Sequence, residues 1–290
     1  MTESTQFSHC ATPRYLTARV IEQERMAQDT YRLRIDCPEV AQVILPGQFF
    51  MIREPDVNDP LLGRPFALYD TCLDDKGTPT GLDFGYVVVG KLTSRMTHWQ
   101  PGDRVEIWGP LGNGFPHPGS GSLVMVAGGI GQTPFLATAR EALGLRQYGQ
   151  PERILPVLPD NVSLLYGARS KAYLAGLDDF QLDGLDVEVA TDDGSYGHRG
   201  FVTELLQQRI ESGSPPSTIF CCGPEPVMEA VSRIASQAGI TCWLSLETPM
   251  ACGFGACFSC VAKVRISDDE WDYRRTCVEG PVFNAESLIF

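Results

Sequence analysis

Four cysteines near the C-terminus restrict the fold of this chain more than any other feature of its sequence. Cys252, Cys257 and Cys260 form a C-x4-C-x2-C run, and sixteen residues separate Cys260 from Cys277. This spacing is typical of a plant-type [2Fe–2S] cluster, in which four thiolates bind two irons. The intervening residues are mostly Gly, Ala and Ser, so the backbone can curl round a cluster and direct N–H groups at its sulfurs. We therefore predict an iron–sulfur cluster bound by these four cysteines.

Two alternatives to the cluster remain: a four-cysteine zinc site and a cysteine group without metal. Structural zinc sites usually combine two short C-x2–4-C pairs. Here three cysteines form one run and Cys277 stands alone. The spacing therefore favours iron over zinc.

The cysteine total does not predict a disulfide framework. The chain has 290 residues and ten cysteines, whereas disulfide-rich folds are usually short secreted domains. The start of the chain, residues 1–13, is polar and lacks the apolar core of an export signal, and no run of 18 apolar residues follows. We expect a cytoplasmic protein that does not enter membranes. The remaining cysteines are Cys10, Cys37, Cys72, Cys221, Cys222 and Cys242.

The negative charge of the chain argues against nucleic acid and anionic lipid as partners. The formal net charge is −13 at pH 7. A charge of this sign opposes binding to nucleic acid and to anionic lipid, so neither is expected as a partner.

The region 1–118 reads as short strands separated by Pro/Gly turns. Short strands at regular intervals without a long helical period favour an antiparallel β-barrel or sandwich. The expected strands are residues 16–22, 31–35, 48–52, 83–89 and 104–108.

Beyond a Pro/Gly/Ser stretch at 118–121, apolar strands alternate with helices. This alternation predicts a doubly wound parallel sheet over 119–240, and we assign 241–290 to a small cluster domain. The expected strands are 123–127, 162–166, 185–190 and 217–221, and the expected helices are 134–143, 203–210 and 226–238.

A glycine-rich turn connects the first strand of the second region to its first helix. It reads Ala127-Gly128-Gly129-Ile130-Gly131-Gln132-Thr133-Pro134. Glycines there allow close approach of a pyrophosphate, and we expect Thr133 as N-cap and Pro134 at the first helical position, so that free N–H groups face an anion. Because Pro134 replaces the third glycine of the Rossmann motif, the turn alone is weak evidence, and simple packing is the alternative.

The segment Cys222-Gly223-Pro224 follows the last predicted strand of that sheet. In open α/β sheets, ligands bind beyond the carboxyl ends of the strands. Cys222 is therefore a candidate for contact with a nicotinamide; a half-buried thiol at a helix start is an equally good interpretation.

Three segments of the N-terminal region are candidates for a second ligand. The first, Arg64-Pro65-Phe66-Ala67-Leu68-Tyr69, places a guanidinium, which binds phosphate bidentately, in an extended stretch. The others are the glycine-containing segments 90–93 and 109–115. Each is ambiguous by itself, because a lone arginine is usually a solvated surface charge.

Taken in order, these segments resemble the ferredoxin–NADP reductase superfamily, and within it the electron-transfer subunits of NAD-dependent dihydroorotate dehydrogenases. The resemblance extends from about Tyr15 to Phe283. Its most specific motifs are GPLGNGF (109–115), TDDGSYGHRGFVT (191–203), CGPEPVM (222–228), MACGFGACFSC (250–260) and GPVF (280–283).

The resemblance implies three cofactors and their ligands. Arg64 would bind the FAD pyrophosphate, the segment Phe66-Ala67-Leu68-Tyr69 would lie along the flavin after Pro65, and Gly90 and Thr93 would support the FAD phosphates. NAD would bind at Gly129, Gly131, Thr133 and Pro134, with Cys222 as the catalytic candidate, and the four C-terminal cysteines would hold [2Fe–2S].

The sequence departs from the family pattern at two flavin positions. Ala67 stands where the family usually has Ser, which removes a hydroxyl that could bond the flavin. Leu92 stands where the family usually has Gly before Thr93, so the backbone beside FAD would differ. Both changes put the affinity or the potential of the flavin in question.

The resemblance implies that the chain transfers electrons between a partner dehydrogenase and NAD. A nicotinamide exchanges a hydride, a cluster carries one electron, and a flavin between them can do both. The family's partner is an FMN-containing catalytic subunit that oxidises dihydroorotate in pyrimidine synthesis, and the expected assembly is a heterotetramer. Asp192, Asp193 and Glu247 are candidates near the flavin or the nicotinamide; ordinary loop polarity is the preferred interpretation.

Three points stay open in the sequence. Arg169 and Lys171 follow the second strand, where cations could meet the 2′-phosphate of NADP, although the resemblance favours NAD. A similar module could serve a hydrogenase or a ferredoxin:NAD(P) oxidoreductase complex. A redox sensor that has lost electron transfer is the third possibility.

Overall fold

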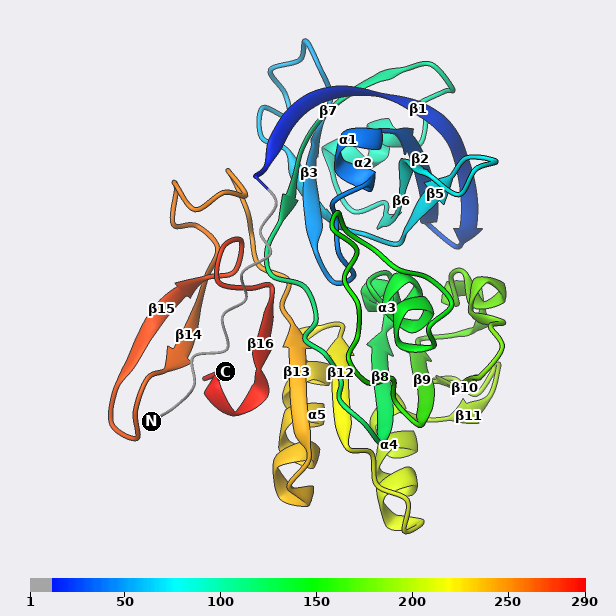
Figure 1. Cartoon of the computed structure of the whole chain (residues 1–290), viewed down its shortest axis with the longest axis vertical. Coiled ribbons are helices and arrows are strands. Elements are labelled where there is room, and N and C mark those ends of the chain that lie inside the picture. Colours follow the sequence, from blue (N-terminus) through cyan, green and yellow to red (C-terminus); the bar gives the residue numbers. More distant parts are fainter. Residues whose placement is uncertain (1–11) are drawn as a thin grey trace.

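A curled antiparallel sheet forms the first part of the chain. The computed structural model describes residues 12–290, and seven strands make up this sheet in the order β4-β3-β7-β1-β2-β6-β5 (Figure 1). The strands are β1 Arg14–Ala27, β2 Thr30–Asp36, β3 Phe49–Arg53, β4 Arg64–Ala67, β5 Asp70–Leu73, β6 Pro79–Val87 and β7 Arg104–Leu111, with the short helices α1 Pro38–Ala41 and α2 Lys91–Met96.

The sheet curls until its β4 edge meets β6. Phe66 of β4 packs its ring against Phe84 of β6, with centroids 4.8 Å apart. Just after β4, the Tyr69 N–H donates to the Asp83 carbonyl at 2.9 Å. Within residues 12–290 the edge strands β4 and β5 do not pair with each other, so the predicted barrel is a strongly curled sheet without a closed ring of strands. The predicted antiparallel architecture of the first domain is confirmed.

A seven-stranded sheet in the order β11-β10-β9-β8-β12-β13-β16 forms the second part. Helix α3 covers one face of this sheet, whereas α4 and α5 pack on the other. Neighbouring strands from β11 to β13 run parallel, as predicted. The elements are β8 Ser122–Gly128, α3 Phe135–Ala142, β9 Asn161–Ala168, β10 Leu185–Thr191, β11 His198–Arg199, α4 Val202–Glu211, β12 Thr218–Cys222, α5 Glu225–Ala238 and β13 Thr241–Ser245.

The C-terminal part consists of the cysteine loop, a hairpin and a returning strand. The hairpin pairs β14 Val261–Arg265 with β15 Trp271–Arg275, and β16 Val282–Asn284 then joins β13 antiparallel. Because β13 lies beside β12 in the second sheet, we propose that the boundary between the second and third domains follows Ser245 instead of residue 240.

The start of α3 differs from the prediction. A 3₁₀ turn, Gly129–Gln132, precedes the helix, and Pro134 is its N-cap residue. The Thr133 hydroxyl donates to the Ile130 carbonyl at 3.0 Å and does not cap the helix. Local hydrogen bonding within the tight turn competes with capping for this hydroxyl. At the other end of the domain, Gly239 ends α5 in the left-handed conformation.

The predictions about disulfides and about membrane spans concern the whole chain. The nine cysteines in the described range are all free thiols, and Cys10 lies outside that range. From residue 12 onward, no helix has both the length and the apolar character needed to cross a membrane.

Candidate functional site

The four C-terminal cysteines come together at the junction with the first sheet. The Sγ atoms of Cys260 and Cys277 lie 3.2 Å apart, and both side chains are buried. Cys257 interacts with the thiol of Cys252 and lies 3.2 Å from the Ser259 hydroxyl. The structure thus arranges the cysteines as two neighbouring pairs.

The two pairs differ in environment. Hydrogen bonds from Ser259, then Cys252, lower the pKa of the exposed Cys257 to about 6. Burial, followed by the neighbouring Cys260, raises the pKa of Cys277 to about 12. One pair therefore faces outward and the other inward.

This donor set fits a two-iron cluster better than a single ion. A zinc site needs four donors on one ion, whereas a [2Fe–2S] cluster takes two thiolates on each of two irons. The pairing of the cysteines therefore supports the cluster.

The cysteine loop packs tightly on β3 and β7. Phe49, Met51 and Leu111 form one buried cluster with Cys260 and Cys277. Gly253 lies so close that a Cβ there would stand 2.6 Å from Met51 Cγ, and its φ of +80° is one that L side chains rarely adopt. The cluster loop can therefore reach the curled sheet only with glycine at this position.

Strand β4 presents different side chains to its two faces. Pro65 pairs with Met51 and Ala67 pairs with Phe49, so Pro65 and Ala67 project toward the same side as these cluster-facing residues. Phe66, by contrast, packs in the core of the curled sheet. Of the residues expected along the flavin, Pro65 and Ala67 thus face the cysteine loop, and Phe66 supports the strand from behind.

Arg64 lies exposed at the start of β4. It donates to the carbonyls of Leu62 and Gly63 at 2.9 and 3.0 Å. No carboxylate in residues 12–290 forms an ion pair with Arg64, so its guanidinium keeps donors for an anion.

Gly90 and Thr93, the residues expected at the FAD phosphates, lie in the turn that leads into α2. Thr93 Oγ1 accepts hydrogen bonds from the N–H groups of Val89 and Gly90, at 3.0 and 3.1 Å. This hydroxyl therefore stabilises the turn before α2. Gly90 borders open space, and Leu92 lies in the core of the curled sheet.

The dinucleotide turn meets both the CGP segment and the first sheet. A Cβ on Gly131 would stand 2.3 Å from the Cys222 carbonyl oxygen. On the other side, Gly85 of β6 is so near that its Cβ would contact Thr133 Cγ2 at 2.7 Å. Gly129 has φ +56° and open space beside it. The turn, Cys222 and the flavin-type sheet therefore converge.

Cys222 is a half-buried neutral thiol. Burial is the main reason that its pKa rises to about 12, and the nearby Glu247 adds to the rise, while Ser245 opposes it. At neutral pH such a thiol packs and donates a hydrogen bond but is not a nucleophile.

Gln132 is a residue of the turn that the sequence analysis did not select. Its side chain is fully buried, yet Nε2 and Oε1 have no hydrogen-bond partner among residues 12–290. A buried unpaired amide is costly, which makes Gln132 a candidate for contact with a ligand. Only the fold could reveal this, because the sequence does not show which turn residues face inward.

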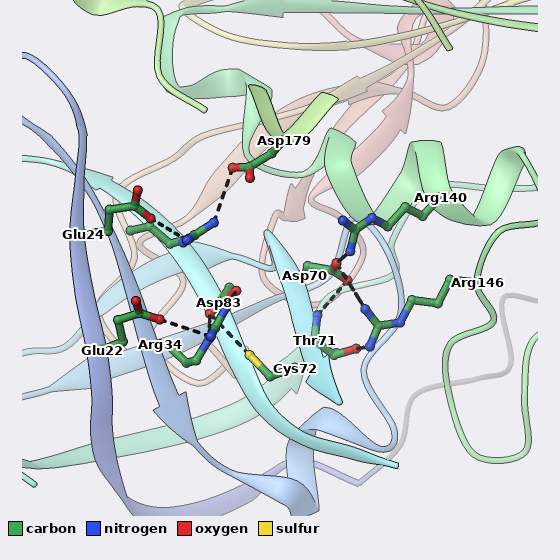
Figure 2. A network of polar contacts seen from close by, with 11 residues as sticks. Glu22, Glu24, Arg34, Asp70, Thr71, Cys72, Asp83, Arg140, Arg146 and Asp179 are labelled. Atoms are coloured by element: carbon green, nitrogen blue, oxygen red, sulfur yellow. Dashed lines mark hydrogen bonds and ion pairs between the residues drawn. The ribbon is translucent and has the colours of Figure 1, made fainter. Parts of the chain in front are cut away.

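Figure 2 shows a second feature that sequence reasoning missed, an ionic network between the two sheets. Asp70 of β5 is buried and accepts hydrogen bonds from Arg140 of α3, from Arg146 at 3.1 Å and from the Tyr148 hydroxyl at 2.8 Å. The network ties the strand that follows the flavin segment to the helix that follows the dinucleotide turn.

The loops after β9 and β10 meet at the carboxyl edge of the parallel sheet. The Asp192 N–H donates to the Ala168 carbonyl, and the Asp193 N–H donates to the Arg169 carbonyl. The Lys171 N–H donates to Ser195 Oγ at 2.7 Å. The two acids and the two cations of the sequence analysis are therefore neighbours.

Three family models match consecutive parts of the chain. Residues 17–115 match the oxidoreductase FAD-binding domain, and residues 125–233 match the oxidoreductase NAD-binding domain. Residues 247–289 match the iron–sulfur cluster binding domain of dihydroorotate dehydrogenase B.

Similar curated proteins cover nearly the whole chain. One, from Desulforamulus reducens, is 34% identical over 94% of this chain and 97% of its own length. Another, from Geobacillus thermodenitrificans, is 37% identical over 93% of this chain and 96% of its own length. Both are named dihydroorotate dehydrogenase B (NAD(+)), electron transfer subunit.

Among solved structures, an NADH-dependent reduced ferredoxin-NADP oxidoreductase, studied for flavin-based electron bifurcation, contains a similar chain. It superposes with a TM-score of 0.78 at 26% identity, covering 94% of this chain and 89% of the other.

Proposed function

This chain belongs to the electron transfer subunits of NAD-dependent dihydroorotate dehydrogenase B, and we propose that it passes electrons between a catalytic subunit and NAD through a [2Fe–2S] cluster and FAD. The observation that carries this proposal is the packing of the cysteine loop on β3, beside β4, in a sheet that also abuts the dinucleotide turn. When bound, the flavin exchanges a hydride with the nicotinamide and single electrons with the cluster.

The residues of β4 would hold the FAD between the other two sites. Arg64 pairs with the pyrophosphate, because its guanidinium is exposed and has no carboxylate partner in the described part of the chain. Pro65 and Ala67 lie along the flavin on the face that they share with Met51. Ala67 has no hydroxyl group, so at this position the strand would hold the flavin ring by packing alone.

The nicotinamide would bind between the dinucleotide turn and Cys222. Gly129 and Gly131 allow its pyrophosphate close to the backbone, and Pro134 begins the helix behind it. The neutral Cys222 thiol packs beside the ring and leaves its charge unchanged. Thr133 acts in this proposal by closing the turn.

The dinucleotide is NAD rather than NADP. Main-chain hydrogen bonds bring the loop of Asp192 and Asp193 beside the loop of Arg169 and Lys171. Carboxylates in this place would repel a 2′-phosphate and could accept a hydrogen bond from a 2′-hydroxyl. The sequence analysis named all four residues, but it did not place the acids next to the cations.

The partner is a catalytic subunit that carries FMN, and the assembly is a heterotetramer in the cytoplasm. The outward pair of the cysteine loop supports such a partner, because Cys257 is exposed between Phe254 and Phe258, which are 59% and 62% exposed. Electrons can leave the cluster on this side through a short distance of protein.

The test is reconstitution with the FMN-containing catalytic subunit under anaerobic conditions. We expect NADH to form when dihydroorotate and NAD are added to both subunits together, and not with either subunit alone. No NADH formation by a mixture with intact FAD, FMN and cluster would contradict the proposal.

A second candidate function rests on the similarity to the ferredoxin-NADP oxidoreductase chain. In that function the same module would exchange electrons with a ferredoxin. Reduction of ferredoxin by NADH without the dihydroorotate-oxidising subunit would favour it. The oxidoreductase chain is 26% identical to this chain in sequence, whereas the two dihydroorotate dehydrogenase subunits are 34% and 37% identical. The exchange of electrons with ferredoxin is therefore the second candidate.

A further inference from the structure

Trp108 of β7 connects the curled sheet to a cluster ligand. Its indole Nε1–H donates a hydrogen bond of 2.8 Å to the main-chain carbonyl of Cys252. The residue is half-buried and packs with the hydrophobic group that surrounds Cys260 and Cys277. The indole is thus the polar part of an otherwise apolar contact between β7 and the cysteine loop.

The other side of the indole faces the flavin segment. A Cβ on Gly63, the residue before Arg64, would stand 2.5 Å from Trp108 Cη2. The ring of Tyr15 stacks on Trp108 with centroids 6.1 Å apart. Met51, which pairs with both Trp108 and Pro65, completes the row across β7, β3 and β4. These contacts hold the indole between the start of β4 and Cys252.

We propose that Trp108 is a positioning residue for electron transfer, which fixes the Cys252 peptide against the flavin-binding strand and raises the reduction potential of the cluster. This inference rests on the proposed function, because it requires the cluster and the flavin to occupy their sites.

The direction of the effect follows from electrostatics. A cluster gains negative charge when it is reduced, and an N–H dipole directed at its ligand loop stabilises that charge. The indole N–H donates to the main-chain carbonyl of Cys252 and not to a sulfur, so it acts as a partial positive charge beside a ligand residue, which favours the more negative, reduced state. Removing the indole N–H therefore lowers the potential. It also frees the loop to move from β4, which slows electron transfer from flavin to cluster.

The test uses Trp108→Phe, which keeps an aromatic ring beside Tyr15 and Gly63 but removes the donor. With iron and sulfide contents equal to wild type, we expect a more negative midpoint potential and an altered electron paramagnetic resonance spectrum of the reduced cluster. After rapid mixing with NADH, flavin reduction keeps its rate, whereas cluster reduction becomes slower. A merely structural contact would not separate these two steps.

A second variant and a control make the result decisive. Gly63→Ala pushes the indole away without changing it, so it should shift the potential in the same direction. Trp271→Phe removes an indole from the exposed end of the β14–β15 hairpin, where it contacts Tyr273 and Lys263, and should leave the potential unchanged.

Three outcomes would overturn the inference. Wild-type potential and cluster reduction rate in Trp108→Phe would refute it, as would an equal shift in Trp271→Phe. If Trp108→Phe does not fold, an unchanged potential in Gly63→Ala refutes it. Wild-type protein without a cluster would instead refute the proposed function itself, so the two failures are distinguishable.

Discussion

Single residues around the dinucleotide turn act through their protonation and their packing. Cys222 illustrates the point, because its position after a buried strand made it a candidate for contact with the nicotinamide, and its environment keeps that thiol neutral. A residue type at a motif position is therefore not enough to assign a role. The pKa of the side chain, set by burial and by Glu247, decides what it can do.

This protonation state predicts slow alkylation of Cys222. With a pKa of about 12, on the order of one Cys222 side chain in ten thousand is a thiolate at pH 8. Alkylation is slow because only the thiolate reacts. Labelling with iodoacetamide in the absence of nucleotide, followed by mass spectrometry, should leave Cys222 unmodified while the same residue reacts in denaturant. Rapid labelling of the folded protein at pH 8 would contradict this.

At the residue scale, the sequence predicts ligands that follow from spacing and misses those that follow from three-dimensional contact. The four cysteines could be selected because cluster ligands lie close together in sequence. Trp108 and Gln132 could not, because a tryptophan in a strand and a glutamine in a turn have no ligand-like spacing. Thr133 was assigned a capping role that its hydrogen bond to Ile130 contradicts.

Among the elements, we propose that the loops after β9 and β10 set the choice of dinucleotide. We predict that Asp192→Asn combined with Asp193→Asn increases activity with NADPH relative to NADH, because Arg169 and Lys171 are then no longer opposed by neighbouring carboxylates. The measurement is kcat/KM for flavin reduction with each dinucleotide. Asp186→Asn, a charge removal at the opposite end of β10, is the control. An unchanged ratio in the double variant would contradict the prediction.

The glycine-rich loop 109–115 has a structural role that its motif alone does not reveal. Asn113 Nδ2 donates to the carbonyls of Glu279 and Val282, and Asn113 Oδ1 accepts from the Val282 N–H at 3.1 Å. The loop therefore binds the segment that leads into β16 and holds the C-terminal part against the first sheet.

We predict that Asn113→Ala destabilises the protein by about 2 kcal/mol, since it leaves half-buried backbone groups unpaired. Denaturant unfolding measures the loss, and limited proteolysis should cut the C-terminal part faster than in wild type. Asn58→Ala, an exposed asparagine of the first domain, serves as control. Equal stability of Asn113→Ala and wild type would show that Asn113 does not hold the C-terminal part against the first sheet.

At the element scale, the period of apolar residues predicts the strands and helices well. The predicted helix at 226–238 corresponds to α5, and the predicted strand at 185–190 corresponds to β10. The returning strand β16 was not predicted, because three residues are too few to show alternation. Its pairing with β13 depends on contacts distant in sequence.

For the whole molecule, buried charges connect the two large domains. Asp70 interacts with Arg140 and Arg146 (Figure 2). Tyr69, beside it in the sequence, donates its hydroxyl to Asp179 at 2.6 Å. These contacts hold the flavin segment and the dinucleotide turn at a fixed separation. The sequence predicted both domains but not this connection, because pairs between domains leave no periodic pattern.

Removing the Asp70 carboxylate should therefore affect both stability and hydride transfer. Asp70→Asn leaves two guanidinium groups without their buried counter-charge, which costs about 3 kcal/mol. We expect a lower midpoint in denaturant and slower flavin reduction at saturating NADH. Asp75→Asn, in the exposed turn after β5, is the control. A stable Asp70→Asn variant with wild-type flavin reduction would show that the domains are held by other contacts.

The assignment as a whole depends on a cluster and a flavin within one chain. A visible spectrum of anaerobically purified protein, with iron, sulfide and flavin counted, measures this. We predict about two irons, two sulfides and one FAD per chain, and bleaching of both chromophores when NADH is added. Protein that is colourless, or that binds zinc after reconstitution with iron and sulfide, would contradict the assignment.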